Sequence, residues 1–218
     1  MNKKLWIVAF ILTLSSTAFA SAETDFLGRL TRDRQGVIIT GYLGRGGAVE
    51  IPGEINGIPV REIDNGAFTY NHTITSIVVP DGVTRIGNSR HPKLVGAFAF
   101  CESLQSITLP AGLLVISAET FLGCITLTTI TIPSTVRIIG ARAFAFCLQL
   151  TEIALPASLE TVGHGAFEGC RLLTTVTVPD SLERVRFSIE SPFKGCSRLS
   201  LSSRAALGNL SYRDFRED

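Results

Sequence analysis

The chain has 218 residues, and its 20 Lys and Arg against 19 Asp and Glu give a formal net charge of +1. A balance this even, with no clustered positive field, argues against a nucleic-acid partner. The five cysteines are an odd number, which rules out complete disulfide pairing within one chain.

Residues 1–20 have the organisation of a secretory signal peptide. Lys3 and Lys4 precede an apolar run from Leu5 to Leu14, and Ala18-Phe19-Ala20 offers a small-x-small cleavage site. The apolar run is shorter than the roughly 20 residues that a membrane-spanning helix needs. We therefore expect an exported mature chain without a transmembrane segment. Cleavage after Ala20 would leave 18 basic against 19 acidic residues.

Residues 21–60 are expected to form an N-terminal cap. Two strand-like segments, Val37–Tyr42 and Ala48–Pro52, flank a Gly-rich turn at residues 43–47. The turn lacks the G-x-G-x-x-G spacing of a phosphate-binding loop, and no helical pattern follows it. The sequence therefore predicts a β-hairpin that seals the open end of the array that follows.

Residues 61–201 contain about six copies of a unit of roughly 23 residues. A phenylalanine, a cysteine and a proline each recur at a constant step of 23 in the four central copies. These columns are Phe98, Phe121, Phe144 and Phe167; Cys101, Cys124, Cys147 and Cys170; and Pro110, Pro133, Pro156 and Pro179. Apolar residues in a Leu-x-x-Ile-x-Leu pattern lie between the cysteine and the proline. Repetition at this period indicates a solenoid of stacked units.

The two outer copies contain insertions. Asn71 replaces cysteine in the copy that begins at Phe68, and seven extra residues, 88–94, separate it from the next copy. Three further residues are inserted near 187–190, before the copy that begins at Phe193. Insertions of this kind map to loops, and terminal repeats act as caps. We interpret residues 202–218 as a C-terminal cap or tail.

The apolar pattern before each proline alternates with a period of two, which is typical of a half-buried strand. Stacking would pair these short strands into one parallel sheet, and the proline would end each strand because it has no N–H. An Ile-Gly step, as in Ile139-Gly140, is interpreted as a turn that leads to the Ala-Phe segment. The predicted fold is a leucine-rich-repeat-like solenoid of short parallel strands in one sheet, with irregular, short helical or 3₁₀ segments on its other side.

The unit "IGARAFAFCLQLTEIALPASLE" resembles the BspA-type leucine-rich repeat of bacterial surface proteins. The leader "VIITGYLGRGGAVEIPGEINGIPVREIDNGAF" is similar to the segment that opens many such arrays. The resemblance covers residues 37–201. It implies a cell-surface or secreted protein that attaches to host or microbial partners, including extracellular-matrix proteins.

The cysteines are the first candidates for chemistry, but their step of 23 excludes C-x-x-C redox and zinc motifs. Cysteines stacked about 5 Å apart could reach a disulfide partner, although side chains in one column point the same way. We therefore predict free thiols that act as small apolar core residues. His72, His91 and His164 lack a catalytic motif, and the sequence offers no catalytic, metal or cofactor site.

Two surfaces are candidates for binding a protein. The first is the outward row of strand residues, which is nearly uncharged and rich in threonine. The β-propensity of threonine alone would explain this composition. A docking face for a protein would also explain it, because solenoid faces of this kind are common binding sites. Its members are Ser106, Thr108, Thr129, Thr131, Glu152, Thr175 and Thr177. The second is the basic insertion with Arg90, His91 and Lys93, either a tolerated surface loop or a contact loop.

A further column, two residues after each core phenylalanine, holds an aromatic side chain in some copies and glycine in the others. The rings could form an exposed apolar patch or pack against a neighbouring turn. For the whole chain we expect a non-enzymatic, adhesin-like protein that binds protein partners. The alternative is an exported inhibitor or a structural envelope protein that uses the same solenoid face.

Overall fold

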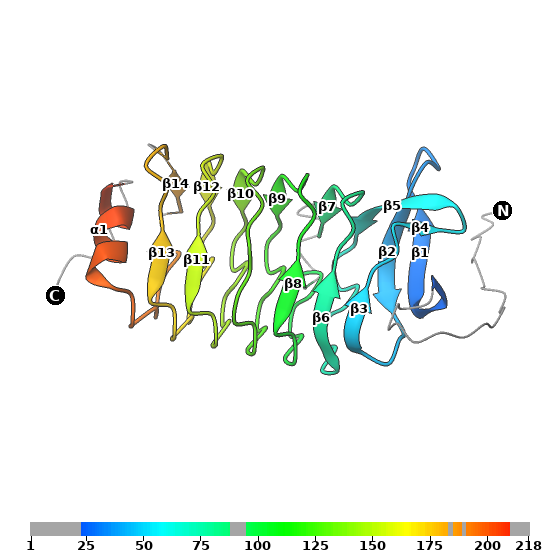
Figure 1. Ribbon diagram of the computed structural model, residues 1–218, viewed down its shortest axis with the longest axis horizontal. Coiled ribbons are helices and arrows are strands. Elements are labelled where there is room, and N and C mark those ends of the chain that lie inside the picture. The colour runs from blue at the N-terminus through cyan, green and yellow to red at the C-terminus, as the bar shows by residue number, and fades with distance from the viewer. Residues whose placement is uncertain (1–22, 88–94, 183–184, 189–190, 210–218) are drawn as a thin grey trace.

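The structure, a computed structural model, describes residues 23–87, 95–182, 185–188 and 191–209. The predicted signal peptide and the basic insertion 88–94 lie outside these residues. The described chain forms an elongated solenoid in which successive turns stack along the long axis (Figure 1). This arrangement confirms the predicted repeat solenoid of stacked parallel strands.

The Ile-x-Leu segments form the predicted parallel ladder. In register, Ser76 pairs with Ser106 and Glu152 pairs with Thr175. The ladder is divided into a three-stranded and a two-stranded sheet. Its strands are β3 (Gly47–Glu50), β6 (Ile74–Val78), β8 (Ser106–Thr108), β11 (Glu152–Ala154) and β13 (Thr175–Thr177).

A second ladder runs along the Ile-Gly steps, where the sequence indicated only a turn. Its parallel strands are β5 (Ile58–Ile63), β7 (Arg85–Ile86), β9 (Val115–Ile116), β10 (Ile138–Ile139), β12 (Thr161–Val162) and β14 (Arg186–Phe187). The expectation of a single sheet was therefore wrong, because the stacked turns form two separate ladders, of which the first is itself divided into two sheets (Figure 1). The Ala-Phe side of each repeat consists of turns, which fits the predicted irregular segments, and no helix or 3₁₀ segment occurs there among the described residues.

The phenylalanine column forms a continuous stack through the core. Ring centroids of consecutive copies lie 5.5, 5.3, 5.2 and 5.0 Å apart from Phe98 to Phe193. The rings are nearly fully buried, with the largest exposed fraction, 3%, at Phe193. A single repeat cannot cover such a ring on both sides, so each ring is buried only when the neighbouring repeats are stacked on it. The stability of the protein therefore depends on the whole array rather than on single repeats.

The column two residues after each phenylalanine adopts a left-handed backbone in every copy. Its φ angle is 59° at Phe100, 71° at Gly123 and 60° at Phe146. Glycine reaches this conformation without steric cost, so its presence in half the copies follows from the backbone. The ring of Phe100 lies over Gly123, where an added Cβ would come within 2.6 Å of the ring. The second interpretation above, packing against a neighbouring turn, therefore holds for Phe100, and it holds equally for Phe146 over Gly169.

The N-terminal hairpin forms from different strands than predicted. Strand β2 (Val37–Tyr42) pairs antiparallel with β1 (Phe26–Leu30), which follows a short 3₁₀ turn at Glu23–Asp25. Strand β3 instead pairs in parallel with β6. The reason is that Val49-Glu50-Ile51-Pro52 matches the strand-and-proline pattern of the repeats, so β3 occupies the position of a repeat strand. A short strand β4 (Glu54–Ile55) pairs with β5.

The C-terminal end is capped by a helix that the sequence analysis did not predict. Helix α1 (Leu201–Asn209) begins after Ser200, whose hydroxyl accepts a hydrogen bond from the Ser203 amide at 3.2 Å, an N-cap contact. The buried hydroxyl of Ser203 accepts a hydrogen bond from the Val176 amide at 2.9 Å. It thereby satisfies an edge group of β13 that has no further strand to pair with.

Candidate binding faces

The predicted Thr-rich face is exposed on the ladder of β6, β8, β11 and β13. All seven candidate residues on it are solvent-exposed, while the alternating residues Ile107, Ile153 and Val176 are buried. The alternation follows from the period-two geometry of a strand. The three basic candidates Arg90, His91 and Lys93 lie outside the described residues. The face is thus continuous along the solenoid, and Glu152 is the single charged member among the seven candidates.

Threonine serves two purposes in this protein. The hydroxyl of Thr126 donates to the carbonyls of Glu102 and Leu104, at 2.6 and 3.0 Å, and so ties consecutive turns together. Thr135 makes the equivalent pair of contacts on the opposite side of the proline turn. By contrast, the hydroxyls of Thr108, Thr129, Thr131 and Thr177 make no hydrogen bond to any described residue. These four hydroxyls are therefore available to a ligand.

The ladder under this face is interrupted in its middle. Residues 129–131 form no strand, although the same positions in the neighbouring copies do. The Val79 amide donates to the Thr108 carbonyl at 3.0 Å, and the Leu155 amide donates to the Thr177 carbonyl at 2.9 Å. The equivalent amides at the interruption, of Leu109 and Ile132, have no such partner in the described part of the chain. The centre of the Thr-rich face is therefore its least constrained segment.

The opposite face, formed by the second ladder, carries paired charges. Glu62 and Arg85 lie side by side on β5 and β7 with 3.5 Å between carboxylate and guanidinium. Glu160 accepts hydrogen bonds from Arg137 of the preceding copy. In the turns that follow this ladder, Arg142 and Glu119, 3.5 Å apart, form a third ion pair between successive copies. Exposed pairs of this kind contribute little stability, but they distinguish the two faces chemically.

The cysteines form no candidate catalytic site. All five are free and buried, which confirms the prediction from their spacing. Burial raises the pKa of the Cys101 thiol to about 12, so it does not ionise near neutral pH. No cluster of three or more His, Cys, Asp or Glu side chains able to hold a metal occurs among the described residues. Within those same residues, no helix is long and apolar enough to cross a membrane.

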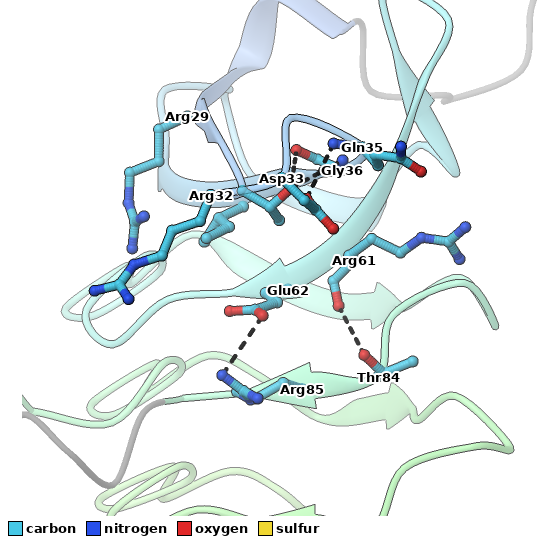
Figure 2. A pocket seen from close by; sticks show the side chains of 11 residues that line it. Arg29, Arg32, Asp33, Gln35, Gly36, Arg61, Glu62, Thr84 and Arg85 are labelled. Atoms are coloured by element: carbon cyan, nitrogen blue, oxygen red, sulfur yellow. Dashed lines mark hydrogen bonds and ion pairs between the residues drawn. The ribbon is translucent and has the colours of Figure 1, made fainter.

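A hollow that the sequence did not predict lies among the described residues. It lies between the β1–β2 loop, residues 31–36, and strands β5 and β7 (Figure 2). Four arginines line it: Arg29, Arg32, Arg61 and Arg85. They come from non-repeating segments and from the first copy, so no column of the repeat could reveal them. The available signal was the density of arginines in residues 29–34, where Arg29, Arg32 and Arg34 lie within six residues.

Residues 61–200 match the family model described as "BspA type Leucine rich repeat region (6 copies)". The chain is similar in structure to a T. pallidum leucine-rich repeat protein, at 31% identity and a TM-score of 0.74, with 89% of this chain and 97% of that one covered. A leucine-rich repeat protein of Bacteroides ovatus is 29% identical, with a TM-score of 0.69, over 80% of this chain and 44% of the other.

A leucine-rich cell-surface protein of Faecalibacterium prausnitzii is 25% identical, with a TM-score of 0.62, over 86% of this chain and 55% of the other. The chain thus spans about half the length of these last two proteins, and nearly all of the first. No protein of curated function matches it.

Proposed function

Because the chain belongs to the BspA-type leucine-rich repeat family, we propose that it is an exported interaction protein whose Thr-rich face docks a protein on a host surface or in the extracellular matrix. Leucine-rich repeat proteins of this family and fold are generally non-enzymatic binding scaffolds. A solenoid suits this task because its stacked turns present one long, regular surface.

The exposed, uncommitted hydroxyls of the strand face carry the proposal. Thr108, Thr131 and Thr177 occupy one outward column of the repeat and Thr129 occupies the neighbouring one. Their hydroxyls make no hydrogen bond to the described residues. This surface, with Glu152 as its single charge among the candidates, is cheaper to desolvate than the ion-paired face of the second ladder, since burying a charge costs more than burying a hydroxyl. A partner could therefore form hydrogen bonds along the row of turns without breaking contacts that hold the array together.

The experiment tests the face by substitution at exposed positions. Thr129→Lys, Thr131→Lys and Thr175→Lys in one variant add three long charged side chains at its centre. Binding of the mature protein to immobilised purified matrix proteins, such as fibronectin, laminin and collagen, is measured by biolayer interferometry. We expect binding by the wild type and a loss of at least ten-fold in affinity for this variant, because the new charges would be buried unpaired.

The matched control places three lysines outside the Thr-rich face, at the exposed positions Ala111 in the proline turn, Leu114 just before β9 and Ile138 in β10. It has the same added charge and should bind like the wild type. Equal binding by the face variant and the wild type would refute the docking face, and equal loss in both variants would show a general charge effect instead.

Export is tested separately from docking. A C-terminally tagged full-length chain, expressed in a bacterial host, is expected to lose residues 1–20 and to appear in the periplasm, at the envelope or in the medium. N-terminal sequencing should identify Ser21 as the first residue of the processed chain. An unprocessed chain confined to the cytoplasm would contradict the predicted export.

A further inference from the structure

The arginine-lined hollow has the size and the polarity of a ligand site. Its volume is about 790 Å³, and it is bounded by the β1–β2 loop on one side and by β5 and β7 on the other. In Figure 2, the side chains of Arg29 and Arg32 extend in the same direction from the hairpin, and Arg61 extends on the other side of the hollow. Cationic groups therefore flank the space rather than gather at a single point.

The charges in the hollow do not cancel. Arg29 pairs with Asp64 at 3.0 Å, and Arg85 pairs with Glu62 at 3.5 Å. Arg32 and Arg61 have no carboxylate partner among the described residues, although Arg61 donates to the Gly82 carbonyl at 3.4 Å. Even the paired arginines retain free N–H donors, because a guanidinium has five. Asp33 is the other acidic side chain in the lining.

The carboxylate of Asp33 is turned into its own loop. One of its oxygens accepts hydrogen bonds from the Thr31 hydroxyl, at 2.5 Å, and from the Gln35 amide, at 3.1 Å. These contacts lower the pKa of Asp33, the Thr31 hydroxyl more than the Gln35 amide. Asp33 is thereby held as a structural element of the loop and forms no ion pair with the arginines. Together with Asp64, which pairs with Arg29, the four arginines face three carboxylates, and this leaves a net charge of +1 around the hollow.

The hairpin loop is seated directly on the Arg61 stem. A Cβ added at Gly36 would lie 2.5 Å from Cγ of Arg61, so the absence of a side chain at position 36 lets the stem cross beneath the loop. Arg61 is therefore held at its base while its guanidinium is exposed. Ordering the stem in advance reduces the entropy that a ligand would have to remove.

The lining also excludes one class of partner. Ile38 is its single large apolar residue, it is buried, and no aromatic side chain contributes. Protein partners usually anchor apolar or aromatic side chains in desolvated pockets, and this hollow has none to offer. Guanidinium groups match the geometry of carboxylate and phosphate oxygens, and of sulfate, which is tetrahedral like phosphate. Thr31, Gln35 and Thr84 offer further polar contacts.

From these observations we propose that the hollow binds a sulfated glycan chain of the glycosaminoglycan type, with Arg32 and Arg61 as its principal contacts. Sulfate groups would bind the arginines, and sugar hydroxyls would bind the threonines and the glutamine. This site is separate from the Thr-rich face, and it does not depend on the function proposed for that face.

A heparin-derived hexasaccharide is the probe, titrated against the mature protein by isothermal calorimetry. We expect saturable one-to-one binding that weakens as NaCl is raised, because salt screens charge interactions. The double variant Arg32→Gln, Arg61→Gln should bind roughly ten-fold or more weakly, since each position loses charge-assisted hydrogen bonds. Arg32→Gln alone, at an exposed loop position, should give a smaller loss, and circular dichroism should show an unchanged fold.

Three comparisons make the result decisive. Arg171→Gln removes an exposed arginine of a distant turn and should leave the affinity unchanged. A desulfated hexasaccharide of equal length should bind far more weakly, and a poly-glutamate peptide should compete poorly. Wild-type affinity in the double variant, an equal loss in Arg171→Gln, or tighter binding of the peptide than of the hexasaccharide would overturn the proposal.

Discussion

The thiol of Cys147 donates a hydrogen bond to the main-chain carbonyl of Phe121, 3.3 Å away and one copy earlier. The same relationship recurs along the array, with distances of 3.1 to 3.3 Å. The Phe121 carbonyl already accepts the amide of Cys124 at 3.2 Å, so the thiol uses its second acceptor position. The cysteine column therefore connects each turn to the one before it. This explains its regularity without any chemical role for sulfur.

Burial of this column predicts a loss of stability at alkaline pH. In the unfolded chain a thiol ionises near pH 9.0, whereas the folded protein holds the Cys101 proton until about pH 12. The pKa values of Cys124 and Cys147 are raised well above 9.0, also mainly by burial. Between the pKa of a thiol in the unfolded chain and its higher pKa in the folded protein, only the unfolded chain releases the thiol proton. The free energy of unfolding should therefore fall by up to about 1.4 kcal/mol per pH unit for each such thiol.

Urea unfolding at pH 8, 9, 10 and 10.5 measures this slope. Cys101→Ala is the matched variant, since it removes one thiol and should flatten the decline by about one proton's contribution. Identical slopes in the two proteins would mean that Cys101 is not protonated preferentially in the folded state.

Because an aromatic ring lies over Gly123 but not over Gly195, substitutions of these two glycines should destabilise the protein by different amounts. Gly123→Ala places a Cβ at a φ of 71° and within 2.6 Å of the Phe100 ring. The left-handed backbone and the overpacking together should cost about 2–4 kcal/mol of unfolding free energy. Gly195→Ala has a φ of 77°, but its nearest neighbours lie at 3.5 Å, so only the backbone cost of about 1 kcal/mol is expected.

Chemical denaturation of both variants checks this difference. Adding Phe100→Ala to Gly123→Ala should recover the overpacking part of the loss, which a double-mutant cycle would report as coupling between the two positions. Equal costs for Gly123→Ala and Gly195→Ala would contradict the ring contact.

The repeat columns were predictable because each one reflects a contact made identically in every copy. The buried Phe98 ring and the exposure of Thr129 both follow from position in the unit. The second ladder was not predictable in this way, since a strand of two residues such as Ile138–Ile139 is too short to show a period-two pattern. Its pairing arises only once the turns are stacked.

The ends of the array and the arginine hollow were hidden for a different reason. The partner of Val37–Tyr42 is Phe26–Leu30, a strand whose Arg29 and Gly28 interrupt its apolar pattern. The hollow then depends on where that hairpin places residues 31–36 relative to Arg61 and Arg85. Contacts made once in the molecule have no second copy against which the sequence can be compared.

The contact between the C-terminal helix and the last strand predicts a loss of stability when Ser203 is substituted. Ser203→Ala removes the buried acceptor of the Val176 amide and also the donor to the Thr174 carbonyl, 3.3 Å away. Leaving that amide buried and unpaired should cost about 1–3 kcal/mol. Ser202→Ala, at an exposed position of the same helix, should change stability by less than about 0.5 kcal/mol. Thermal unfolding of the two variants measures the difference, and equal stabilities would show that Ser203 does not cap the sheet.

The interruption beneath the Thr-rich face predicts unequal protection of equivalent amides. Leu109 and Ile132 occupy the same positions in their copies as Val79 and Leu155, whose amides are bonded at 3.0 and 2.9 Å. Without those bonds, the amides of Leu109 and Ile132 should exchange with solvent deuterium faster than the other two, by roughly ten-fold for each 1.4 kcal/mol of local opening energy. Hydrogen exchange followed by NMR resolves each amide separately. Because all four side chains are buried, slower solvent access at one position cannot account for a difference.

If a protein partner docks on this face, its binding should slow exchange at Leu109 and Ile132 more than at Val79. Equal protection of all four amides in the free protein would instead mean that the ladder is continuous through residues 129–131.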